Sequence, residues 1–136
     1  MANYYETARS NYFLVKDEEA FKKECSFIGD CEISTQVRND KTYYAIIGSQ
    51  EYGFPVWLRD ENEDEIEIEI DWEDFFKRHL ADDEVAIVMG AGSEKIRYVN
   101  GWAVAYNNKG DAVSVNLDDI YEKAKSLGSN ITHASY

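Results

Sequence analysis

Apolar and polar residues alternate along several segments of this chain, and this period of two is typical of half-buried strands. Seven segments have this alternation or the β-branched and aromatic composition that favours strands: residues 7–16, 31–37, 42–47, 55–58, 84–89, 96–106 and 112–117. The turn-forming residues 38–41 join the second and third segments into a β-hairpin. A further turn at residues 107–110 completes a three-strand meander from the last three segments.

Two glycine-containing stretches predict interruptions within the meander. Residues 90–93 (Gly-Ala-Gly-Ser) follow an apolar strand and predict a flexible turn. They do not predict a phosphate-binding loop, because the spacing G-x-x-x-x-G-K-[ST] and the third glycine of a dinucleotide fingerprint are both missing. Asn100-Gly101 predicts a break or a bulge inside the long strand 96–106.

Three segments repeat their apolar residues with the spacing of an amphipathic helix. They are residues 17–27, a stretch of about ten residues that begins at Asp71, and residues 118–127. Asp17 and Asp71 suit the N-caps of the first two, and Asp118 or Asn116 suits that of the third. Gly29 and Gly128 are expected to end the first and the third. The side chains expected to point inward are Phe21, Cys25, Ile28, Trp72, Phe75, Phe76, His79, Leu80, Ile120, Tyr121, Ala124 and Leu127.

Strands joined by short turns, with helices at the ends and in the middle, predict an α+β fold. We expect a single domain over residues 1–136, with a mainly antiparallel sheet of about six to seven strands and three helices. A sheet that curls into a partial barrel is the alternative. Residues 129–136 are expected to form a flexible tail.

Residues 60–74, which we call the acidic window, concentrate the charge of the chain. They read D-E-N-E-D-E-I-E-I-E-I-D-W-E-D, and ten of the fifteen residues are acidic while none is Lys or Arg. The whole chain has 27 acidic and 14 basic residues, a net charge of −13. Without the ten acids of the window, 17 acidic residues remain and the net charge is only −3.

Isoleucine and glutamate alternate in the middle of the acidic window, which predicts a strand. The isoleucines at positions 66, 68 and 70 would face a core, and the glutamates at positions 65, 67 and 69 would face water, about 6.6 Å apart. One interpretation is an edge strand that its charges protect from edge-to-edge pairing. Because far fewer charges are enough for that, the excess favours a functional anionic face.

The same stretch partly matches a calcium-binding loop. Asp60, Asn62, Asp64 and Asp71 have the spacing of the first, third, fifth and twelfth loop positions. Glu65, however, occupies the sixth position, where the sharp turn requires glycine. We therefore predict no specific metal site and no cofactor, with weak binding of divalent cations by crowded carboxylates as the alternative.

The composition limits the classes of partner and the compartment. Net negative charge opposes direct binding to nucleic acid, which needs clustered Lys and Arg, and it opposes anionic membranes. No apolar run approaches the roughly 20 residues that span a bilayer, and no signal-peptide pattern is found. The spacing C-x5-C of Cys25 and Cys31 matches neither a zinc site nor a redox pair, so two free thiols are expected. We expect a cytoplasmic protein.

No catalytic motif is present, and we predict no catalytic residue. His79 is expected to be a partly buried or helix-terminal residue rather than a catalytic base. An enzyme site around His79, Arg97 and Tyr98 is the less favoured alternative. Aromatic residues before the acidic window predict either core packing under a loop or an interface: Tyr43, Tyr44, Tyr52, Phe54 and Trp57.

Residues 11–19 (NYFLVKDEE) and 94–101 (EKIRYVNG), together with the size and the focused charge, resemble small acidic proteins of phages, plasmids and integrative elements. Among these proteins, the chain is similar to the antirestriction and anti-CRISPR DNA mimics. The resemblance implies carboxylates that stand where DNA presents phosphates and that occupy the basic groove of a host nuclease. The chain departs from the most extreme mimics because most of it is nearly neutral, which favours a local blocking surface.

We therefore predict a non-enzymatic inhibitor or interaction protein, whose partner is a basic nucleic-acid-binding protein such as a host nuclease or defence effector. The alternative is an accessory domain of a mobile element whose acids serve solubility only. The residues predicted to contact the partner are Asp60, Glu61, Glu63, Asp64, Glu65, Glu67, Glu69, Asp71, Glu73, Asp74, Tyr52 and Trp57.

Overall fold

The computed structural model describes residues 4–29, 31–48, 53–60, 63–94 and 97–134, and for residues 4, 57–60 and 63–68 it describes the backbone alone. In chain order the elements are β1 (Tyr4–Ser10), α1 (Glu18–Cys25), β2 (Cys31–Arg38), β3 (Lys41–Gly48), β4 (Trp57–Asp60), β5 (Glu63–Glu69), α2 (Trp72–His79), β6 (Ala86–Glu94), β7 (Tyr98–Tyr106), β8 (Ala112–Asn116) and α3 (Asp119–Lys123), which a 3₁₀ turn at Ala124–Ser126 follows.

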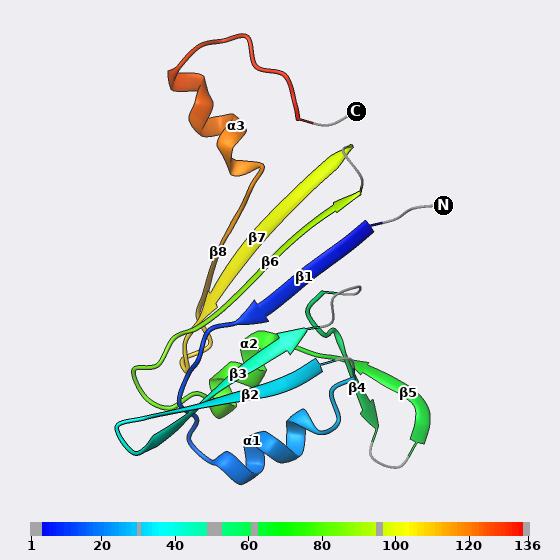
Figure 1. The fold of residues 1–136 in the computed structure, drawn as a ribbon, viewed down its shortest axis with the longest axis vertical. Coiled ribbons are helices and arrows are strands. Elements are labelled where there is room, and N and C mark those ends of the chain that lie inside the picture. Colours follow the sequence, from blue (N-terminus) through cyan, green and yellow to red (C-terminus); the bar gives the residue numbers. More distant parts are fainter. Residues whose placement is uncertain (1–3, 30, 49–52, 61–62, 95–96, 135–136) are drawn as a thin grey trace.

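The strands form an open six-stranded sheet and a separate two-stranded hairpin. The sheet has the order β2-β3-β1-β6-β7-β8 and its neighbouring strands are antiparallel, while β4 and β5 form the hairpin. Figure 1 shows α1 and α2 near β2 and β3, and α3 apart from them beyond the end of β8. The predicted α+β fold with a mainly antiparallel sheet and three helices is confirmed, and the sheet is open rather than barrel-like.

β2 and β3 form the predicted hairpin, in register down to the pair Arg38–Lys41. The two residues of the turn, Asn39 and Asp40, have φ angles of 52° and 63°. Positive φ at both central residues is the type I′ geometry that matches the twist of the strands, and Asn and Asp tolerate it well. The turn thus sets the register of the hairpin.

Aromatic side chains build the core on one face of the sheet. Phe13 is fully buried, and its ring lies edge-on to Phe21 of α1, with 5.9 Å between centroids, and to Phe76 of α2, with 5.6 Å. Tyr44 and Ile46 of β3 supply the sheet side of this core. Edge-to-face contacts of this kind add to the stabilisation from burial.

The first strand lies earlier in the chain than predicted. β1 ends at Ser10, and residues 11–16 continue irregularly, with an isolated bridge between Phe13 and Tyr44. The strand predicted over residues 7–16 was therefore wrong in its second half. Aromatic residues occur there because that segment crosses the core, not because it pairs along a ladder.

Both interruptions predicted within the meander were wrong. Residues 90–93 continue β6, and the pairing with β7 is unbroken there and at the position of the expected bulge. The glycines instead permit close packing. A Cβ at Gly90 would lie 2.7 Å from Cζ2 of Trp102, and a Cβ at Gly101 would lie 2.9 Å from Cγ of Leu117.

The first two helices begin at their predicted caps. The Asp17 carboxylate accepts a hydrogen bond from a backbone N–H of α1 at 3.1 Å, and the Asp71 carboxylate accepts one from α2 at 3.2 Å. The predicted stripe of Phe21, Cys25 and Ile28 is buried. α1 nevertheless ends at Cys25, so the expectation that glycine 29 ends it was wrong.

The third helix is shorter and more exposed than predicted. None of the residues in α3 or in the 3₁₀ turn is buried, and Ile120 and Leu127 are 58% and 91% exposed. The predicted inward face was wrong, because helical spacing of apolar residues does not ensure that another element covers them. Residues 129–134 form neither helix nor strand, and the Ala134 N–H donates to the Tyr121 hydroxyl at 2.7 Å. The flexibility of this tail stays a prediction.

Candidate anionic cleft

The acidic window runs from the last residue of β4 through β5 to the start of α2. β5 is the strand that the alternation of Ile and Glu predicts, and it pairs with β4. The register places Arg59 of β4 opposite Glu67 and Trp57 opposite Glu69. Opposed residues of an antiparallel pair lie about 5 Å apart on the same face. In the backbone register, Arg59 is thus the basic residue of β4 that pairs with a glutamate of β5.

Part of the predicted contact surface lies outside what the structure describes. Tyr52 and Glu61 are outside the described residues, and the side chains of Trp57, Asp60, Glu63, Asp64, Glu65 and Glu67 are outside it as well. The predicted side chains that the structure does describe are Glu69, Asp71, Glu73 and Asp74. All four are exposed.

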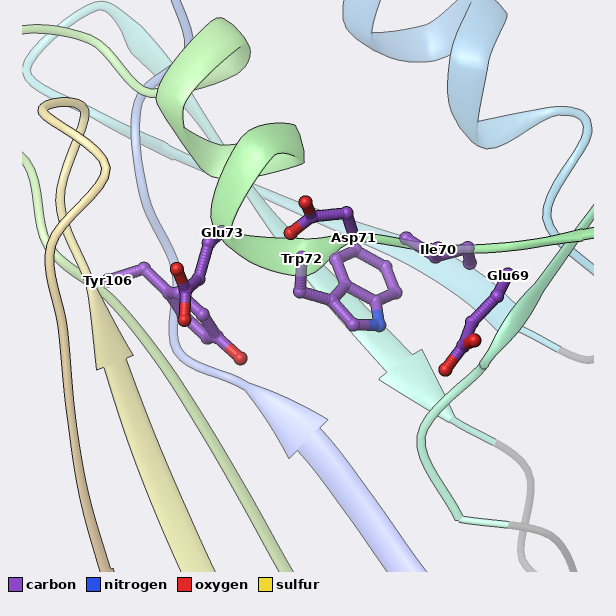
Figure 2. A pocket seen from close by; sticks show the side chains of 6 residues that line it. All are labelled: Glu69, Ile70, Asp71, Trp72, Glu73 and Tyr106. Carbon is purple, nitrogen blue, oxygen red and sulfur yellow. The ribbon is translucent and has the colours of Figure 1, made fainter.

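Three of these carboxylates surround a cleft of about 440 Å³ at the start of α2. Glu69 ends β5, Asp71 caps α2 and Glu73 lies in its first turn. The residues between them point inward, since Ile70 is buried and Trp72 is half-buried. The described lining contains no basic residue and consists of Glu69, Ile70, Asp71, Trp72, Glu73 and Tyr106 (Figure 2).

Aromatic packing holds Trp72 in place between the three carboxylates. Its ring centroid is 4.7 Å from that of Phe54 and 5.6 Å from the stacked ring of Phe76. Its indole N–H donates to the Pro55 carbonyl at 2.9 Å. The start of α2 is thus anchored both to the loop before β4 and to the core.

Tyr106 closes the cleft from the end of β7. Burial raises the pKa of Tyr106, and the negative charges of Glu73 and Asp71 raise it further. The phenol therefore stays protonated at neutral pH and offers an O–H donor beside the carboxylates. Carboxylates next to aromatic rings are the surroundings that suit a Lys or Arg side chain, through charge-assisted hydrogen bonds and cation–π attraction.

Asp74 forms an ion pair within the molecule. Arg78 donates from Nε to the Asp74 carboxylate at 2.7 Å and from both terminal nitrogens to Glu24 of α1 at 2.5 and 2.8 Å. The hydrogen bond from Arg78 is the main cause that lowers the pKa of Glu24, and His79, with Nε2 at 2.9 Å, lowers it further. This cluster ties α1 to α2, so Asp74 has a structural role whatever else it contacts.

The three residues of the enzyme alternative do not converge. His79 is buried at the end of α2, the helix whose Phe76 ring lies 4.9 Å from that of Tyr106 at one end of β7. Tyr98 is at the other end of this nine-residue strand. The two ends are about 27 Å apart at the rise of an extended strand. Arg97 precedes Tyr98, so both lie far from His79.

The described residues include no group of three or more His, Cys, Asp and Glu side chains that could hold a metal ion. In the same part of the chain, every helix is too short or too polar to cross a bilayer. Comparisons with protein-family models, with curated proteins and with solved structures find no match.

Tyr106 is the cleft residue that the sequence did not reveal. It is distant from the acidic window in the chain, and only the return of β7 to the start of α2 brings it there. The sequence shows only that Tyr106 ends an apolar strand, and many core residues have that property.

Proposed function

We propose that this protein is a non-enzymatic acidic interaction protein that binds a basic nucleic-acid-binding protein and occupies its nucleic-acid groove. The observation that carries the proposal is the gathering of ten acids in residues 60–74, three of which are exposed around an aromatic cleft. A phage or mobile-element inhibitor of a host nuclease or defence effector, of the antirestriction or anti-CRISPR type, would have this character.

The charge spacing supports a local blocking surface. Alternate residues of β5 are about 6.6 Å apart, whereas one DNA strand carries a phosphate about every 3.4 Å along the axis. The row of glutamates thus has about half the linear charge density of a single DNA strand. It suffices to neutralise a short row of Lys and Arg, and the cleft adds a site for one further cationic side chain. The bound protein would exclude nucleic acid from the partner's groove, because Lys and Arg side chains that contact its carboxylates cannot contact phosphates at the same time.

A specific observation favours the second candidate, an accessory domain whose acids serve solubility only. β4 and β5 form a hairpin of their own, and charges on a short isolated hairpin prevent edge-to-edge pairing with other chains. Two acids of the window also have a base nearby: Arg59 stands opposite Glu67 in register, and Arg78 binds Asp74. On this interpretation the window has no partner.

Charge reversal with a matched control separates the two candidates. One variant carries Glu65→Lys, Glu67→Lys and Glu69→Lys in the window. The control carries the same three changes at Glu19, Glu32 and Glu122, which are exposed and lie outside it. Both variants have a net charge of −7 instead of −13. Each immobilised chain is exposed to host lysate, and the captured proteins are eluted with a salt gradient or with double-stranded DNA.

The proposal expects the wild-type chain and the control to capture a nucleic-acid-binding protein that both salt and DNA release. The window variant should lose it. If the window variant and the control capture the same proteins, or if DNA releases nothing, the blocking function is wrong and the solubility interpretation stands.

A further inference from the structure

Over strands β1, β6, β7 and β8, one face of the sheet is mostly apolar and exposed. Directly paired residues of antiparallel strands share a face, and the pairing aligns Met89 of β6 with Ala103 of β7 and Val115 of β8. The neighbouring set of paired residues on the same face ends at Val113 of β8. Val113, Val115 and Met89 are 71%, 63% and 55% exposed. Small and aliphatic side chains thus lie side by side in contact with water.

The same face continues toward the far ends of the strands. Tyr5 of β1 aligns with Ser93 and, through it, with Val99 of β7, and these two large side chains are 56% and 63% exposed. Leu117 lies over Gly101 and is 51% exposed. We call this surface the open face; its large residues are Tyr5, Met89, Val99, Val113, Val115 and Leu117.

The open face is the side of the sheet that the helices do not cover. The residues that alternate with it along β6, Ala86 and Val88, are buried in the core. Tyr106 points the same way as Ala86 and contacts Phe76 of α2. Figure 1 shows α1 and α2 away from the far ends of β1, β6 and β7, and α3 beyond β8.

The size of the open face matches one side of a stable interface. Six large side chains, each about half exposed, together with the alanines between them, present on the order of 400 Å² of apolar surface if a buried aliphatic side chain removes ~60–120 Å². One partner of a standard interface contributes about 800 Å², and a little over half of it is apolar. The open face therefore supplies roughly the apolar part of a complete interface.

Its scarcity of charge favours a second copy of the same chain. The six large residues are uncharged, and the charged side chain that shares their rows on β1, β6, β7 and β8 is Arg9, which pairs with Met89. A face with this composition offers nothing to the cationic partner of the acidic window. The net charge of the chain outside the window is only −3, so two copies can approach through this face with their windows apart. Flat aliphatic sheet faces also pack on each other directly, about 10 Å apart, as in β-sandwiches.

We propose that two copies of this chain form a two-fold symmetric dimer in which their open faces pack together. The same patch then meets itself across the axis, as in most homodimers. The dimer presents two acidic windows instead of one, which raises avidity for a partner with two basic sites. The proposal that the chain dimerises does not depend on the function proposed for the acidic window.

Sedimentation or light scattering of the purified full chain tests the proposal. The wild-type chain should have twice the 15.7 kDa mass of the monomer. Val113→Lys with Val115→Lys places two charges in the apolar interface and should raise the dimer dissociation constant more than ~100-fold. Ala112→Lys with Ser114→Lys is the matched control, because these residues are exposed on the same strand but point to the opposite face.

A wild-type chain that stays monomeric at tens of micromolar would overturn the dimer, because its dissociation constant would then be weaker than that concentration. This measurement does not depend on the folding of any variant. A double variant that stays dimeric would overturn it too, as would a control that dissociates equally. Added salt should preserve or strengthen the dimer, since it screens repulsion between two acidic copies. The binding of a cationic partner should instead weaken, so dimerisation and the proposed function can fail separately.

Discussion

At the residue scale, the clearest interaction is the bidentate pair of Glu24 and Arg78, which joins the two core helices. The Glu24 side chain is 21% exposed and Arg78 is 46% exposed, so water weakens the pair but does not remove it. Glu24 also accepts from His79. Loss of the carboxylate charge weakens the hydrogen bonds that Arg78 and His79 donate to this side chain.

We expect Glu24→Gln to lower the free energy of unfolding by about 1–2 kcal/mol at pH 7. Arg78 lowers the pKa of Glu24 in the folded state, so the stabilisation is present above the ordinary value of 4.5 and is lost as the pH falls through the lowered folded value. The gap between wild type and variant should therefore be widest at neutral pH and close in acid. Urea unfolding at several pH values measures it. Glu122→Gln, which removes an exposed pair with Lys125, should change little at any pH.

Substitution of Gly90 should destabilise the fold, because a side chain at this position would point at the indole of Trp102. A Cβ there would lie 2.7 Å from Cζ2, and Trp102 is further held by a hydrogen bond to Glu6 at 3.3 Å. We expect Gly90→Ala to cost about 1–3 kcal/mol of stability and to shift the tryptophan fluorescence. Gly128→Ala has no atom within 4 Å of the new Cβ and should be nearly neutral. Equal effects at both sites would contradict the packing role of Gly90.

Helix caps and the tight turn were predictable at this scale because each depends on neighbours in the chain. Asp17, Asp71 and the pair Asn39-Asp40 act through atoms a few residues away. The role of Gly90 was not predictable, since glycine in a strand indicates either a turn or a close approach, and only the partner strand decides which.

At the scale of elements, α2 connects the fold to the candidate site. Asp71 both caps this helix and lines the cleft, so a single side chain serves stability and charge. Two substitutions separate these roles. Asparagine keeps a side-chain oxygen for the cap and removes the charge, whereas alanine removes both.

We expect Asp71→Ala to lower the free energy of unfolding by about 1 kcal/mol and Asp71→Asn by only a few tenths, as thermal or urea unfolding would show. Both should lower the pKa of Tyr106 toward its ordinary value, because the Asp71 charge contributes to raising it. NMR titration of labelled tyrosine, assigned with Tyr106→Phe, measures this shift. A Tyr106 pKa that is unchanged in both variants would mean that Asp71 does not act on the cleft.

The period of apolar residues predicted α2 and α3 equally well, but only α2 is buried. Trp72, Phe75 and Phe76 meet rings from distant segments, whereas Ile120 and Leu127 remain exposed. A sequence pattern shows which face of a helix is apolar but not what will cover it. The same limit explains why Tyr106 was missed in the cleft and why β8, with its alternating valines, leaves them exposed.

At the scale of the whole molecule, charge and apolar surface are separated. The acidic window runs from the end of β4 through β5 to the start of α2, while the open face lies on β1, β6, β7 and β8. Composition alone predicted the first, because ten acids in fifteen residues are visible in the sequence. The second required the register of three strands, which brings Met89 and Val115 onto one surface.

Repulsion within the acidic window should make the stability of this protein increase with salt. Like charges at about 6.6 Å repel in the folded state, and raising the salt from about 0.15 M to about 1 M shortens the screening length from ~8 Å to ~3 Å, which weakens this repulsion. We therefore expect the thermal midpoint of the wild-type chain to rise with sodium chloride. Replacing Glu65, Glu67 and Glu69 by Lys should flatten this rise, whereas the same replacement at Glu19, Glu32 and Glu122 should largely keep it. Both variants have the same net charge, so equal flattening would mean that total charge, rather than its concentration in the window, governs the effect.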